Sequence, residues 1–172
     1  AAAALGYEIL LLRLFSIIQW HHFAYMIISL ALLGYGSSGT FLAIAGRWPQ
    51  RSYTALFAAN AVFFGFSSVG CFLLAQRVPF NPLELLWEPR QFLLLAAIYV
   101  LLSIPFFFAA NCIGLSFYRF RDRVGRIYGS DLLGAGVGAA GVIVLLLALS
   151  PSEALRALGA LGPVAAALSV FG

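Results

Sequence analysis

The chain has 172 residues, of which 63% are hydrophobic and only 9% are charged. A water-soluble domain of this length carries roughly a quarter charged residues, so the composition excludes an ordinary soluble domain and indicates a protein dissolved in lipid. The net charge of +4 comes from arginine alone, because the chain has no lysine. The arginines lie mostly between apolar runs rather than on a basic, aromatic-rich face, so no nucleic-acid partner is expected.

Six apolar runs follow one another along the chain. They cover residues 1–18, 23–45, 53–75, 91–118, 127–149 and 154–172. A membrane-spanning helix needs about 20 apolar residues, whereas the strands of a membrane barrel alternate apolar and polar residues. Because these runs are apolar on every face, we predict an all-α integral membrane protein: one domain of about six transmembrane helices, with the lipid bilayer as its partner.

Short sequence signals refine these helices. Residues 150–153 read Ser-Pro-Ser-Glu, which is typical of a helix start, and Pro105 predicts a kink in the fourth helix. Small residues three or four apart on a helix allow a neighbouring helix to approach closely. They predict packing faces on the second and fifth helices, composed of Gly34, Ser38, Gly36, Gly39, Gly125, Gly129, Ser130, Gly134 and Gly138.

Arginine placement predicts the orientation. Six arginines lie in or beside the second and fourth connections and three beside the third and fifth: Arg47, Arg51, Arg119, Arg121, Arg123 and Arg126 against Arg77, Arg90 and Arg156. Loops rich in arginine stay in the cytoplasm. We therefore expect loops 46–52 and 119–126 to be cytoplasmic.

The polar residues within the apolar runs that could carry chemistry are Glu8, Arg13, Asn111 and Asp131. Charged groups in lipid cost several kcal/mol unless they find partners. Since Glu8 and Arg13 point about 140° apart on one helix, we predict a buried cluster that joins Arg13 to Asp131 through Glu8, with Tyr7 or Asn111 donating hydrogen bonds. Such a cluster is either a structural tie or part of a proton or substrate path.

The first connection carries Trp20, His21 and His22. Adjacent histidines lack the spacing of metal ligands on a helix, and aromatic side chains gather at membrane surfaces. We expect these three residues to be interfacial. Two isolated cysteines, Cys71 and Cys112, form no metal pattern, so no metal site is predicted.

Several segments resemble one family. YEILLLRLFSIIQWHHFAYMIISLALLGYGSSG, IPFFFAANCIGLSF and VGRIYGSDLLGAGVGA occur in this order. They resemble the membrane domain of bacterial spermidine synthase-like (polyamine aminopropyltransferase-like) proteins. The matching residues of the first segment are Glu8, Arg13, Phe15, Ser16, Trp20, His22, Phe23, Ala24, Ile28, Ser29, Leu30, Ala31, Leu32 and Gly34.

The resemblance implies a fold like half of a major-facilitator transporter, in a bacterial inner membrane. It also implies a C-terminal soluble transferase domain in the same polypeptide that uses an S-adenosylmethionine-type cofactor. The glycine-rich loop of such a domain is not in this sequence, so we expect no catalytic residue, no cofactor-binding residue and no cofactor here. The alternatives are half of a major-facilitator-like secondary transporter and a purely structural membrane module.

The ends of the sequence suggest a segment of a longer polypeptide. The first residue is Ala1, the only methionine is Met26 within an apolar run, and the last residue, Gly172, ends another apolar run. No basic leader or cleavage site precedes the first run.

Overall fold

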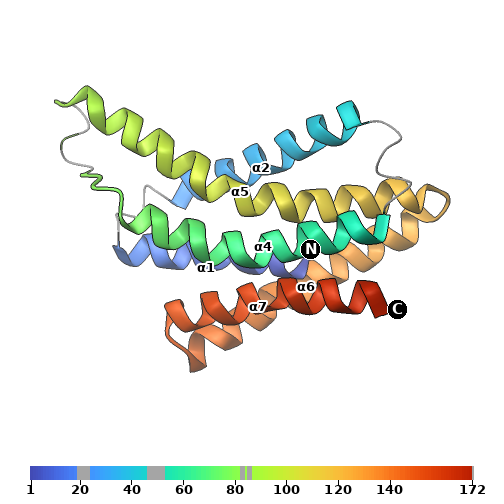
Figure 1. Ribbon diagram of the computed structural model, residues 1–172. Helices are drawn as coiled ribbons and strands as arrows, with labels where there is room; N and C mark the ends of the chain where they lie inside the picture. The colour runs from blue at the N-terminus through green and yellow to red at the C-terminus, as the bar shows by residue number, and fades with distance from the viewer. Residues whose placement is uncertain (19–23, 46–52, 82–83, 85–86, 172) are drawn as a thin grey trace.

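A computed structural model describes residues 1–18, 24–45, 53–81, 84 and 87–171. These residues form long α-helices and one short 3₁₀ helix, η3 (Arg121–Arg123), and contain no strand (Figure 1). The long helices are α1 (Ala2–Ile18), α2 (Ala24–Ala45), α4 (Tyr53–Gln76), α5 (Pro89–Arg119), α6 (Val124–Ala148) and α7 (Pro151–Phe171). Each begins and ends within three residues of an expected apolar run.

Four of these helices, α2, α4, α5 and α6, are long and apolar enough to cross a membrane. The all-helical membrane architecture is therefore confirmed at this level. The 17 residues of α1 rise about 25 Å, less than the ~30 Å hydrocarbon core. Helix α7 carries Glu153 and Arg156 in its first two turns. Six spans remain a prediction.

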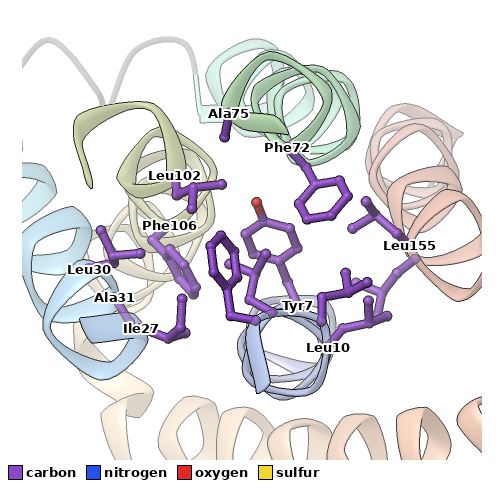
Figure 2. Packing of buried hydrophobic residues seen from close by; sticks show 14 of the residues in the cluster. Tyr7, Leu10, Ile27, Leu30, Ala31, Phe72, Ala75, Leu102, Phe106 and Leu155 are labelled. Atoms are coloured by element: carbon purple, nitrogen blue, oxygen red, sulfur yellow. The ribbon is translucent and has the colours of Figure 1, made fainter. Parts of the chain in front are cut away.

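The helices pack as a bundle around α1. Helix α5 packs against both α2 and α4, α4 also packs against α7, and α1 contacts α2, α5, α6 and α7. The core lies between α1 and the facing sides of α2, α4, α5 and α7 (Figure 2). Three α1 side chains, Tyr7, Leu10 and Leu11, are fully buried there.

Small residues set the closest helix contacts. A side-chain carbon at Gly34 of α2 would lie 2.5 Å from the Phe106 Cβ of α5, and one at Gly65 of α4 would lie 2.5 Å from the Gly159 carbonyl oxygen of α7. Gly138 of α6 lies equally tightly against the backbone of Ala2. Only glycine permits these approaches, because any larger residue would collide with a neighbouring helix.

Part of the predicted packing pattern is wrong. Gly36, Gly39, Gly125 and Gly129 have open space where a side chain would extend. At about 100° per residue, Gly36 lies on the opposite side of α2 from Gly34. By the same geometry Gly125 and Gly129 lie about 180° and 140° from Gly134, so they cannot continue its stripe.

Two local predictions hold. Helix α5 contains Pro105 and is bent near its middle (Figure 1), as expected where a proline removes a backbone hydrogen bond. Helix α7 begins at Pro151, and the Glu153 carboxylate accepts hydrogen bonds from the Ser150 backbone N–H (3.0 Å) and hydroxyl (2.7 Å). These hydrogen bonds give the Ser150 backbone N–H at the start of the helix an acceptor, as in a capping box.

A candidate polar site between α2, α4 and α5

The buried polar centre of the bundle is Asn111 on α5. Its side-chain oxygen accepts a hydrogen bond from the Ser38 hydroxyl of α2 at 2.6 Å, and its amide nitrogen donates to the Asn60 side-chain oxygen of α4 at 3.1 Å. The Asn60 amide in turn donates to the Leu56 carbonyl oxygen at 2.7 Å. The chain of donors and acceptors thus links three helices, and we call Ser38, Asn60 and Asn111 the polar tie.

Two members of the polar tie are buried, because Ser38 and Asn111 are 1% and 2% exposed, and Asn60 is half-buried. An unpaired amide or hydroxyl would cost several kcal/mol at such a place, so the three side chains favour the one packing in which all of them are satisfied. None of them titrates near neutral pH, so the polar tie can position helices but cannot carry a proton.

Further polar contacts between α4 and α5 lie closer to the start of α4. The Tyr53 hydroxyl and the Ser116 hydroxyl are 3.3 Å apart, and the Cys112 thiol lies 3.7 Å from the Phe57 carbonyl oxygen. They are one or two turns from the polar tie on the same α4–α5 interface.

A cavity of about 430 Å³ lies beside these contacts. Its wall is mostly apolar, and Asp131 of α6 is its one ionisable carboxylate. The α5 and α6 parts of the wall come from residues 104–117 and 124–139. They are Ala109, Cys112, Ile113 and Ser116 of α5, and Ile127, Ser130, Asp131 and Gly134 of α6.

The predicted cluster of Arg13, Glu8 and Asp131 is not assembled. The Asp131 carboxylate lies beside the start of α1, with the Ala1 nitrogen 3.6 Å away, and no ion pair joins it to Glu8 or Arg13. By helical rise Glu8 lies about 10 Å and Arg13 about 18 Å further along α1. Glu8 is half-buried and Arg13 is exposed.

The expected hydrogen-bond donors, Tyr7 and Asn111, do not bond to the predicted cluster either. Asn111 bonds to Ser38 and Asn60, and the fully buried Tyr7 hydroxyl has no hydrogen-bond partner among the described residues. Figure 2 shows this hydroxyl directed from α1 toward Phe72, Ala75 and Leu102. The Tyr7 ring instead contacts aromatic rings, with its centroid 5.2 Å from that of Phe106.

Trp20, His21 and His22 lie outside the described residues, so their interfacial role stays a prediction. Among the residues that are described, no three His, Cys, Asp or Glu side chains gather as metal ligands would.

The prediction from sequence missed Asn60, although an amide side chain within an apolar run could have indicated a buried polar contact. It treated Ser38 only as a small packing residue and so missed its hydroxyl.

Comparisons with protein-family models, with curated proteins and with solved structures found no match.

Proposed function

We propose that this chain is the membrane-embedded domain of a spermidine synthase-like protein. It anchors a cytoplasmic transferase domain of the same polypeptide and passes a substrate to it. In this proposal all six long helices cross the bilayer, and the S-adenosylmethionine-type cofactor binds only in the transferase domain.

The proposal rests on the contacts among the three segments that resemble the family. Gly34, from the first segment, packs against Phe106 and Phe107, from the second. The second segment then faces the third across the cavity, through Cys112 and Ser116 on one wall and Asp131 on the other. The second segment therefore contacts the first at the α2–α5 crossing and faces the third across the cavity, as expected for a single folded unit.

The position of the cavity supports the role toward a cytoplasmic domain. Ser116 and Ile127, in its wall, lie within one turn of Arg119 at the end of α5 and Arg126 at the start of α6. By arginine count this is the cytoplasmic end. A ligand that left the cavity at this end would meet a domain on the cytoplasmic side.

The test is fractionation of the full polypeptide with and without residues 1–172. We expect transferase activity with an S-adenosylmethionine-type cofactor to sediment with carbonate-washed membranes when these residues are present, and to become soluble when they are deleted. Activity that stays in the membrane after deletion would contradict the anchoring role. A polypeptide with six further spans and no glycine-rich strand–loop–helix unit after residue 172 would instead favour the half-transporter.

A further inference from the structure

The end of α5, the η3 connection and the start of α6 together carry a dense group of positive charge. Four arginines lie within eight residues, and all four side chains are exposed: Arg119, Arg121, Arg123 and Arg126. Helix η3 turns the chain between two helices that are long and apolar enough to cross the membrane. The group, which we call the η3 arginine cluster, is therefore held at the surface of the bilayer.

The charge of this cluster is not neutralised within the described residues. Asp122 is the only acid in the connection, and no guanidinium of the cluster has a carboxylate within ion-pair distance there. At the other end of the bundle, Arg13, Arg77, Arg90 and Arg156 are accompanied by Glu84, Glu88 and Glu153. Among the described residues, the η3 end therefore has the larger excess of positive charge, with four exposed arginines against Asp122.

Exposed aromatic and aliphatic side chains alternate with the arginines. Tyr118, Phe120, Val124 and Tyr128 are 42%, 40%, 46% and 59% exposed, and the Arg119 guanidinium lies 5.6 Å from the centre of the Phe120 ring. Amphipathic rings of this kind favour the boundary between acyl chains and headgroups. Arginine can lie along them and extend its charged group to the headgroup phosphates.

We propose that the η3 arginine cluster binds anionic phospholipid headgroups, with phosphatidylglycerol as the test lipid. A guanidinium donates two parallel hydrogen bonds to a phosphate, and basic clusters next to a membrane helix bind anionic lipid. The observations favour lipid over a soluble phosphate or a protein surface, because the cluster is interleaved with exposed apolar side chains and lies within one turn of two spans.

The test is native mass spectrometry of the whole chain in detergent, with equal amounts of phosphatidylglycerol and phosphatidylcholine added. We compare the unsubstituted protein with R121Q/R123Q, and R77Q/R90Q removes the same charge at the other end as the matched control. The protein should retain phosphatidylglycerol preferentially. The preference should fall about fivefold per arginine removed in R121Q/R123Q and stay unchanged in R77Q/R90Q.

Three results would overturn the proposal. Equal retention of both lipids would leave no anionic-lipid site, and equal losses in the two double variants would mean that net charge alone acts. Release of phosphatidylglycerol by millimolar glycerol 1-phosphate would identify a soluble phosphate as the ligand. Retained phosphatidylcholine and an unchanged elution profile exclude misfolding as the cause of a loss.

Discussion

The Ser38 hydroxyl donates a hydrogen bond of 2.6 Å to the Asn111 side-chain oxygen across the α2–α5 interface, 73 positions apart in sequence. The neighbouring Ser37 hydroxyl instead bonds to the Gly34 carbonyl of its own helix at 3.0 Å. Two adjacent serines therefore differ in whether they connect helices. This contrast makes the polar tie testable with a single-residue control.

Substituting Ser38→Ala should destabilise the fold, because Asn111 loses its buried donor. Hydrogen bonds between membrane helices contribute about 0.6 kcal/mol on average and up to about 1.7 kcal/mol. We expect a loss near the upper value, measured as the free energy of unfolding in a detergent–dodecyl sulfate titration. Ser37→Ala should change it by much less, and equal effects of the two substitutions would show that the bond to Asn111 adds nothing.

The α4–α7 crossing gives a second prediction. Ala at Gly65 would force a methyl carbon to within 2.5 Å of the Gly159 carbonyl oxygen, whereas the space at Gly70 of the same helix is open. Gly65→Ala should therefore cost about 1–3 kcal/mol, the usual range for overpacking. Gly70→Ala should be neutral or slightly stabilising, because alanine favours a helix over glycine. The melting temperatures of the two variants in detergent check this, and a neutral Gly65→Ala would contradict the close crossing.

Tyr7 gives a third prediction, because its ring is packed but its hydroxyl has no partner among the described residues. A buried hydroxyl without a partner costs about 1–3 kcal/mol. Tyr7→Phe should therefore leave stability unchanged or raise it, while Tyr7→Ala should lower it by about 3–5 kcal/mol through lost packing. The same unfolding titration measures both, and a clear loss in Tyr7→Phe would reveal a partner for the hydroxyl.

The helices were predictable from the apolar runs because few backbone structures are stable in lipid. A backbone in hydrocarbon must satisfy its own hydrogen bonds, so each long apolar run had to be a helix. The contacts between helices were not predictable in the same way. Gly34 and Gly36 look alike in sequence, but only Gly34 meets a neighbouring helix.

The predicted charged cluster failed for a physical reason. It assumed that Arg13 and Asp131 must pair, but each lies near a helix end. Arg13 is five residues from the end of α1, about 8 Å by helical rise, and an arginine side chain can reach the membrane surface over that distance. The tie that does form is between neutral residues, for which the cost of burial is smaller and a partner is easier to place.

The most direct test of the membrane arrangement is labelling of single cysteines with a membrane-impermeant maleimide, in a background of Cys71→Ala and Cys112→Ala. Glu88→Cys and Asp122→Cys lie just outside the two ends of α5, and Ser52→Cys directly precedes the first residue of α4 in the sequence. We predict that intact cells label Glu88→Cys only, and that Ser52→Cys and Asp122→Cys react after the membrane is permeabilised. Labelling of Glu88→Cys and Asp122→Cys from the same side would contradict the account, because α5 would then not cross the membrane.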